Sequence, residues 1–175
     1  LLMQQNPFML YAGEEYGERG MDREGFSGND GRTTIFDYWS VDTLCRAASG
    51  QLTEQEKALH DIHVKTMHIA RQEKTVAEGV FFDLMYVNSH LQRQYAFLRR
   101  AEGELLLVVA NFDGSDVTIN VNVPSHAFDF LTMKEKKVIA TDLLTKEKLA
   151  MSMKRDGAVR MEVGAYSGRV WKIKL

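Results

Sequence analysis

Carboxylates are the side chains of this chain that could do chemistry, and seven of them lie between positions 14 and 37. Two carboxyl groups held rigidly side by side, with the pKa of one raised by burial, can act as a general acid and base pair. The segment 13–51 also contains seven glycines, and a glycine-rich loop does not hold two side chains in one geometry. We therefore expect no catalysis by these residues alone. The seven acids are Glu14, Glu15, Glu18, Asp22, Glu24, Asp30 and Asp37.

Histidines offer a second kind of chemistry, since His60, His63 and His68 fall on one predicted helix. The first two are one turn apart, which is a spacing that metal ligands use. No cysteine or third ligand stands nearby to complete a site, so the pattern favours a solvated helix surface. The segment 22–31 has some features of a calcium loop, but Phe26 interrupts it and no terminal glutamate follows. We expect neither a metal site nor an organic cofactor.

Composition limits the class of protein. The chain has 175 residues, of which 45% are apolar, enough for a packed core and too many for intrinsic disorder. The formal net charge of −2 disfavours binding of the whole molecule to nucleic acid or to an anionic membrane. Cys45 is the single cysteine and cannot form an internal disulfide, and no apolar stretch is long enough to span a membrane. Because the chain begins at Leu1, we expect it to be part of a longer protein.

The charged residues divide the chain into two parts of different character. Residues 1–78 carry 8 Lys and Arg against 13 Asp and Glu, which is a net charge of −5. Residues 79–175 carry 14 Lys and Arg against 11 Asp and Glu, which is a net charge of +3. We therefore predict two structural parts with a boundary between positions 78 and 79.

Residues 79–175 show the pattern of an all-β domain. Val117, Ile119 and Val121 alternate with polar residues, which is typical of a strand with one buried face. The run 105–110 is apolar throughout, as expected for a central strand that is covered on both faces. About eight short strands in so short a segment favour a sandwich or barrel. The predicted strands lie near 80–87, 94–101, 105–111, 117–123, 136–142, 148–153, 158–163 and 168–174.

The N-terminal part shows a strand, a long loop and a helix in that order. The apolar run 8–12 predicts a buried strand, and the irregular loop 13–51 follows it. Thr53 and Glu56 form a capping box that predicts a helix over 53–74. This order is that of the last repeat of a β/α barrel, in which the loop after the strand carries function. The helix residues expected to face inward are Ala58, Leu59, Ile62, Met67, Ile69 and Ala70.

Three segments together resemble the α-amylase family of glycoside hydrolases. The run 7–17, Pro-Phe-Met-Leu-Tyr-Ala-Gly-Glu-Glu-Tyr-Gly, is similar to the eighth barrel strand of that family and the loop after it. The segment 32–39, Arg-Thr-Thr-Ile-Phe-Asp-Tyr-Trp, is similar to an Arg-Thr … Trp segment of the same loop. The run LLLVVANFDGSDVTINV resembles a hairpin of the β-sandwich called domain C. The resemblance implies a mainly β fold with two parts. Residues 1–78 would be the last strand, loop and helix of the β/α barrel, and residues 79–175 would be an all-β Greek-key sandwich of the domain C type.

The resemblance also implies a function. Members of the family are retaining enzymes that act on α-glucosidic linkages through two carboxylates, assisted by a third acid. These acids belong to earlier barrel strands and have no counterpart in this chain. The resemblance thus implies the C-terminal portion of an α-amylase-type retaining glycoside hydrolase or glucanotransferase, not catalytically competent by itself, whose intact parent binds α-glucan or maltooligosaccharide. In an intact barrel, the residues that would line sugar subsites are Glu14, Tyr16, Asp30, Arg32 and Trp39.

Two alternatives stay open. The predicted subsite residues could be structural. Glu15 and Arg32 would then tie the loop to itself, and Tyr11 and Trp39 would belong to a core. The protein could instead be a non-catalytic carbohydrate-binding or structural β-sandwich, with sugar bound on exposed aromatic residues such as Phe128 and Phe130.

A last expectation concerns association. In a complete barrel the strand at 8–12 has neighbours on both edges, and the apolar face of the helix at 53–74 is covered. If both are left bare, they favour edge pairing and hydrophobic association. We therefore expect either a homo-oligomer that forms through residues 1–74 or a rearrangement by which this region covers itself.

Overall fold

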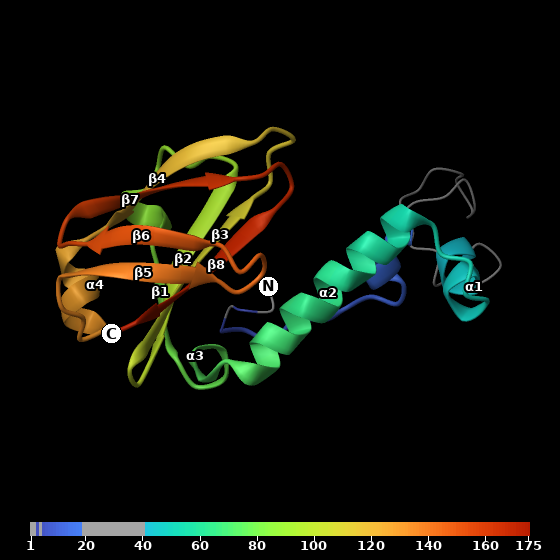
Figure 1. The fold of residues 1–175 in the computed structure, drawn as a ribbon, viewed down its shortest axis with the longest axis horizontal. Coiled ribbons are helices and arrows are strands. Elements are labelled where there is room, and N and C mark those ends of the chain that lie inside the picture. Colours follow the sequence, from blue (N-terminus) through green and yellow to red (C-terminus); the bar gives the residue numbers. More distant parts are fainter. Residues whose placement is uncertain (1–2, 4, 19–40) are drawn as a thin grey trace. The chain divides into compact units, whose positions relative to one another are not determined.

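The computed structural model describes residues 3, 5–18 and 41–175. These residues form two compact units, and Figure 1 colours them along the sequence. The larger contains residues 69–175 together with Met3 and Gln5, and we call it the sandwich unit. The smaller contains the described residues from Asn6 to His68, and we call it the helical unit.

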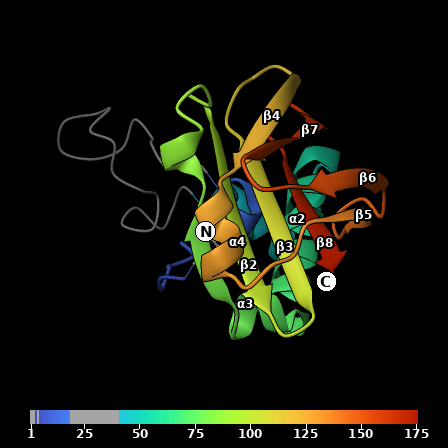
Figure 2. The same cartoon turned by 90° about the vertical axis from the view of Figure 1, so that its left-hand side faces the viewer.

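Eight strands of the described residues pair antiparallel in the sandwich unit (Figures 1 and 2). Six form one sheet in the order β1-β2-β3-β8-β5-β6, and β4 pairs with β7 in a second sheet. Because β8 lies between β3 and β5, strands distant in sequence are neighbours in the larger sheet. This architecture confirms the predicted fold class, a mainly β sandwich. The strands are β1 Val80–Asp83, β2 Gln94–Ala101, β3 Glu104–Asn111, β4 Val117–Val123, β5 Lys136–Asp142, β6 Lys148–Met153, β7 Gly157–Val163 and β8 Gly168–Lys174.

Strand β3 is buried on both faces, as its apolar run predicts. Leu105, Leu107 and Val109 belong to the main hydrophobic core of the sandwich. Leu106 and Val108 belong to a second cluster on the other face of the same sheet. Successive side chains of a strand point to opposite faces, so a continuous apolar run marks a strand covered on both sides. Strand β4 alternates buried and more exposed positions instead, because only one of its faces meets the core.

The outer face of the larger sheet is covered by chain that precedes β1. The short helix α3 (Lys74–Ala77) packs on β2 and β3. One residue from the end of the preceding helix and one from the N-terminal segment complete the cover. Each large apolar side chain that is fully buried contributes about 1.5–3 kcal/mol, so this cover is a large part of the stability of the sheet. The buried members of the second cluster are Met3, Ile69, Phe97, Leu106, Val108 and Val170.

Two cations on the outer face of the sheet bind the same covering segment. On β2, Arg99 Nε donates a hydrogen bond to the Thr75 carbonyl at 3.0 Å, and its Nη2 donates to the next carbonyl. On β8, Lys172 Nζ lies 2.7 Å from a carboxylate oxygen of Glu73 and 3.0 Å from one of Glu104. Burial acts against the charge of Lys172, but the hydrogen bonds to the two carboxylates raise its pKa above the usual value. Both cations thus attach the segment before β1 to the sheet.

The helical unit contains the 3-10 helix η1 (Glu14–Tyr16), the helix α1 (Asp42–Ala48) and most of α2 (Glu54–Gln72). The capping box at the start of α2 is confirmed. Thr53 N donates to the Glu56 carboxylate at 2.8 Å, and Glu56 N donates to the Thr53 hydroxyl at 3.3 Å. Among the described residues, no helix is both long and apolar enough to cross a membrane.

Three expectations for the N-terminal part were wrong in detail. The segment 8–12 forms no strand, because no strand of the described residues lies beside it to supply hydrogen bonds. The expected loop 13–51 contains the helix α1. On α2, only Ile69 of the predicted inward set is fully buried, whereas Ile62 and Met67 are exposed. Association through this part of the chain stays a prediction.

The second cluster predicts how far the chain can be shortened from its N-terminal side before the sandwich loses stability. A chain of residues 69–175 keeps Ile69 and α3 on the outer face, whereas a chain of residues 79–175 leaves Phe97 and Leu106 uncovered. We expect the shorter chain to lose about 3 kcal/mol or more of unfolding free energy. Urea unfolding followed by circular dichroism measures the difference. Equal midpoints and slopes for the two chains would show that the cover contributes nothing.

Candidate functional site

Two of the five predicted sugar-subsite residues lie in the described part of the chain, and both belong to η1. Glu14 is exposed, and its carboxylate accepts a hydrogen bond from the Tyr11 backbone N–H at 3.2 Å. Tyr16 is half-buried. The structure therefore brings Glu14 and Tyr16 together on one turn, while the complete subsite stays a prediction. The three that lie outside the described residues are Asp30, Arg32 and Trp39.

A tight turn between two glycines positions Glu14 and Tyr16. Gly13 and Gly17 have φ values of 88° and 74°, in the left-handed region that glycine adopts without strain. The Gly13 carbonyl accepts hydrogen bonds from Tyr16 N at 3.0 Å and from Glu18 N at 2.9 Å. A Cβ atom at Gly13 would lie 2.6 Å from Glu18 Cβ, so a larger residue does not fit. These two glycines serve a defined turn, whereas the sequence analysis treated them as part of an irregular loop.

The ring of Tyr16 stacks on the imidazole of His60 in α2. The two ring centroids are 5.1 Å apart, and the ring planes are 9° from parallel. One face of the Tyr16 ring is thereby covered by His60. His60, predicted to lie on a solvated helix surface, is partly exposed and also supports Tyr16. No local pattern signals the contact, because the two residues are brought together by the path of the chain between them.

Glu18 acts as a cap for helix α1. One of its carboxylate oxygens accepts hydrogen bonds from Thr43 N at 2.9 Å, from Leu44 N at 3.3 Å and from the Thr43 hydroxyl. A carboxylate is stabilising here because the first N–H groups of a helix have no partners within the helix and carry partial positive charge. Glu18 was grouped with the candidate acids. Sequence reasoning missed its role because the cap is 25 residues from the position it serves.

Glu56 connects the two helices of the helical unit. Its carboxylate accepts hydrogen bonds from Nε and Nη2 of Arg46 in α1, in addition to the capping-box bond from Thr53 N. The hydrogen bond from Arg46, followed by the one from the Thr53 backbone, lowers the pKa of Glu56 to about 2. A carboxyl group with so low a pKa is a poor general acid near neutral pH. Glu56 therefore has a structural role.

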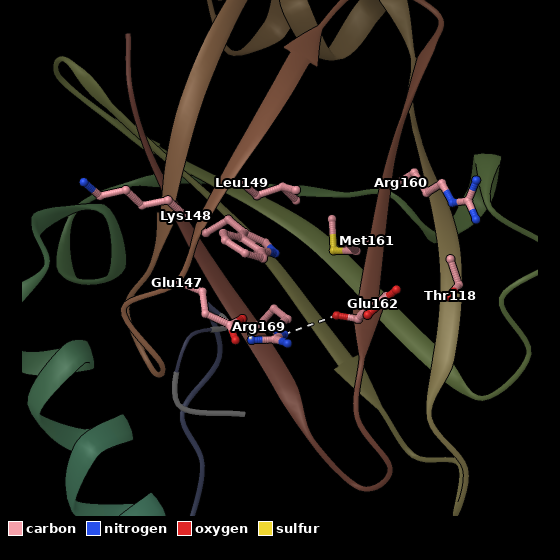
Figure 3. A pocket seen from close by; sticks show the side chains of 9 residues that line it. Thr118, Glu147, Lys148, Leu149, Arg160, Met161, Glu162 and Arg169 are labelled. Carbon is pink, nitrogen blue, oxygen red and sulfur yellow. Dashed lines mark hydrogen bonds and ion pairs between the residues drawn. The ribbon is translucent and has the colours of Figure 1, made fainter.

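The sandwich unit has a cleft of about 410 Å³, lined by residues of β4, β6, β7 and β8 (Figure 3). Arg169 Nη1 lies 3.1 Å from a carboxylate oxygen of Asp142 and 2.5 Å from one of Glu147. Its Nε donates to the Glu162 backbone carbonyl at 3.2 Å, shown as the dashed line in Figure 3. The guanidinium also lies over the ring of Trp171, 5.8 Å from the ring centroid.

Arg169 beside this cleft is paired with Asp142 and Glu147. Asp142 is fully buried, and its carboxylate accepts hydrogen bonds from Leu144 N, Val170 N and the Thr145 hydroxyl as well as from Arg169. Burial acts against the charge of Arg169, but the hydrogen bond to Asp142 and the nearby carboxylates raise its pKa. A buried charge that is fully paired is a structural element. We assign no catalytic role to this cleft.

Metal ligation finds no support in the part of the chain that the structure describes. Residues 3, 5–18 and 41–175 contain no group of three or more His, Cys, Asp or Glu side chains that could hold a metal ion. His63 Nδ1 lies 3.0 Å from the Leu59 carbonyl, and His60 stacks on Tyr16. The segment 22–31, with its partial likeness to a calcium loop, lies outside the described residues.

The aromatic residues named for the carbohydrate-binding alternative differ in exposure. Phe128 is 0% exposed and belongs to the main core, so its prediction as a surface aromatic was wrong. Phe130 is 62% exposed. Both belong to the short helix α4 (Ser125–Phe130), where residues two apart point in different directions. Only one of the two is available to a ligand.

The turn at Gly13 predicts a stability difference between two glycine substitutions. Gly13→Ala and Gly50→Ala both place alanine at a positive φ, which costs about 1–2 kcal/mol. Only the alanine at position 13 also collides with Glu18, since a Cβ at Gly50 meets open space. Hydrogen exchange at the Thr43 amide, which Glu18 holds, should therefore accelerate more in Gly13→Ala than in Gly50→Ala. Equal acceleration would contradict the crowding at Gly13.

The contact between Arg46 and Glu56 predicts a pH effect. The folded pKa of Glu56 is about 2, below the ordinary value of 4.5, so the contact stabilises fully above pH 4.5. That contribution falls as the pH drops from 4.5 toward 2. A carbon-13 NMR titration should place the Glu56 midpoint near 2, and Arg46→Ala should move it toward 4.5. Lys65→Ala, on the same helix as Glu56, should leave the midpoint unchanged, and an unshifted midpoint in Arg46→Ala would contradict the assignment.

Comparisons with known proteins agree with the fold. Neither a family model nor a curated protein sequence matches the chain. A maltogenic α-amylase from Thermotoga neapolitana, 13% identical, matches with a TM-score of 0.52 over 67% of this chain and 26% of its own. AmyP in complex with maltotriose, 12% identical, matches with a TM-score of 0.52 over 70% of this chain and 22% of its own. The chain thus spans about a quarter of the length of these proteins and shares the fold of a portion of α-amylase family glycoside hydrolases.

Proposed function

We propose that this chain is the C-terminal portion of an α-amylase-type retaining glycoside hydrolase or glucanotransferase that acts on α-glucans. The observation that carries the proposal is the order of parts along one chain. A turn with Glu14 and Tyr16 is followed by a long helix, which continues directly into an antiparallel sandwich. Strand β3 of that sandwich carries the first four residues of the Val-Val-Ala-Asn-Phe run at 108–112 that resembles domain C.

The proposal divides the chain at position 78, with the end of a β/α barrel before it and domain C after it. The compact units divide nearer to position 68, because the segment 69–77 packs on the outer face of the sandwich. The boundary at position 78 follows from the family resemblance. The boundary near position 68 follows from the packing of this chain.

The contacts of the described acids in the helical unit support the proposal that this chain lacks a catalytic pair of its own. Glu14 accepts a hydrogen bond from the backbone, Glu18 caps α1, and Glu56 pairs with Arg46. None of these contacts holds two carboxylates across a bond in the way that retaining hydrolysis requires. In the parent enzyme the catalytic acids come from earlier strands. Glu14 and Tyr16 then contribute hydrogen bonds and a stacking face to sugar subsites, together with Asp30, Arg32 and Trp39.

The substrate class is proposed from the resemblance and from a structural neighbour. AmyP, which has a similar fold, has been solved in complex with maltotriose and with maltose. We propose α-glucan or maltooligosaccharide as the partner of the intact parent. The alternative, a non-catalytic carbohydrate-binding or structural sandwich, differs in that the protein has no hydrolytic parent. Activity of the longer gene product therefore separates the two.

The proposal predicts that the chain alone is inactive. Incubated with soluble starch or a chromogenic maltooligosaccharide, it should release no product, because the three acids of the family have no counterpart here. The product of the whole gene, including any sequence before Leu1, should release reducing sugar from starch. Turnover by the isolated chain that is lost in Glu14→Gln or Glu15→Gln would overturn the proposal. A whole gene product that is inactive on every α-glucan tested would overturn it as well.

A further inference from the structure

We propose that the sandwich unit carries a surface contact for α-glucan, separate from the turn at Glu14 and Tyr16. The contact consists of Phe82, Tyr86 and Phe130 together with His126, and we call these four residues the aromatic patch. This proposal takes its substrate class from the proposed function. It goes beyond that function by placing sugar on the sandwich itself.

The Phe82 ring contacts the other three rings of the aromatic patch. Phe82 is at the centre, with its ring centroid 6.3 Å from that of Tyr86, 5.2 Å from that of His126 and 5.7 Å from that of Phe130. The Tyr86 hydroxyl lies 2.6 Å from His126 Nε2. Phe82 belongs to the main core and is nearly buried, so it fixes the other rings from below. Three chain segments, β1, η4 (Met85–Val87) and α4, thus contribute to one surface.

The two outer rings of the patch are open to solvent. Tyr86 is 57% exposed and Phe130 is 62% exposed, which is unusual for two large rings that flank the same core residue. An aromatic ring with free surface can stack on the apolar side of a pyranose. Because both rings contact Phe82, one short oligosaccharide can reach both of them.

Polar groups around the patch suit the hydroxyls of a sugar. The Tyr86 hydroxyl donates or accepts, and burial together with the Asp83 carboxylate raises the pKa of this phenol, so that it stays protonated. Asp129 and Arg155 form an ion pair at 2.6 Å beside Phe130, and both side chains are partly exposed. Apolar rings bordered by exposed donors and acceptors are typical of a carbohydrate contact. A purely apolar patch would favour a protein partner instead.

The aromatic patch lies on the core side of β1, opposite to the side that the covering segment occupies. Phe81 packs with the second cluster, under the segment before β1, whereas Phe82 packs with the main core. Successive residues of a strand point to opposite faces, so the patch and the covering segment are on opposite sides of β1. The contact therefore remains available while the segment 69–77 covers the outer face. For a polymeric substrate, a second contact on the same protein raises the effective concentration of chain at the first.

Native gel electrophoresis of the full chain in gels that contain soluble starch tests the proposal. We expect starch to retard the chain and hydroxyethyl cellulose, a β-linked polymer, to have no effect. The double variant Tyr86→Ala/Phe130→Ala should lose about tenfold in affinity for starch, as expected when two stacking contacts are removed. Tyr86→Phe keeps the ring and should retain most of the retardation. The matched control is Phe112→Ala, which removes another exposed ring of the sandwich unit and should change nothing.

Four outcomes would overturn the aromatic patch as a sugar contact. The first is an unretarded full chain, and the second is equal retardation of the double variant and the full chain at matching circular dichroism spectra. The third is loss of retardation in Tyr16→Ala but not in the double variant, which would assign the sugar to the helical unit and leave the proposed function standing. The fourth is that the double variant abolishes self-association, measured by light scattering, without changing retardation. The patch would then be a contact between copies of the chain.

Discussion

The middle strands of the larger sheet carry apolar side chains on both faces, and both faces have to be removed from water. The two-stranded sheet covers one of them. The other is covered by Met3, Ile69 and the helix α3, which precede the first strand. The sandwich is therefore incomplete without chain that the sequence places outside it. This explains why the compact unit begins at Ile69, ahead of the first strand.

Polar contacts give this cover a defined position on the sheet. Apolar contact alone has little directional preference, whereas a guanidinium binds carbonyl groups with fixed geometry. Arg99 takes that role, although its Nη1 and the Thr75 hydroxyl are buried without a partner among the described residues. Leaving such groups unpaired is unfavourable. The contact between the covering segment and the sheet thus combines a large hydrophobic stabilisation with a smaller cost from unpaired polar groups. Lys172 adds its contacts with two carboxylates to the same region.

The acids of the helical unit illustrate how the same residue type can serve structure or chemistry. Glu18 and Glu56 accept several hydrogen bonds each, and those that Glu56 accepts from Arg46 and the Thr53 backbone lower its pKa. Glu18 caps α1 and Glu56 connects α1 to α2, so both side chains serve the structure. The sugar contacts that we propose are aromatic rings instead, namely Tyr16 in the helical unit and Tyr86 and Phe130 on the sandwich.

The local pattern of the sequence determined seven of the eight strands, the doubly buried strand β3 and the capping box of α2, because period-two alternation and cap spacing act over a few residues. The strand predicted near 80–87 ends at Asp83, and Met85–Val87 form η4 instead. Only the tertiary structure decided which residues meet across long stretches of chain. The cap of α1 by Glu18, the stack of Tyr16 on His60 and the burial of Phe128 beside an exposed Phe130 depend on such meetings. For the same reason the run at 8–12 forms no strand, since a strand needs a neighbouring strand to complete its hydrogen bonds, and an apolar run cannot supply its own partner.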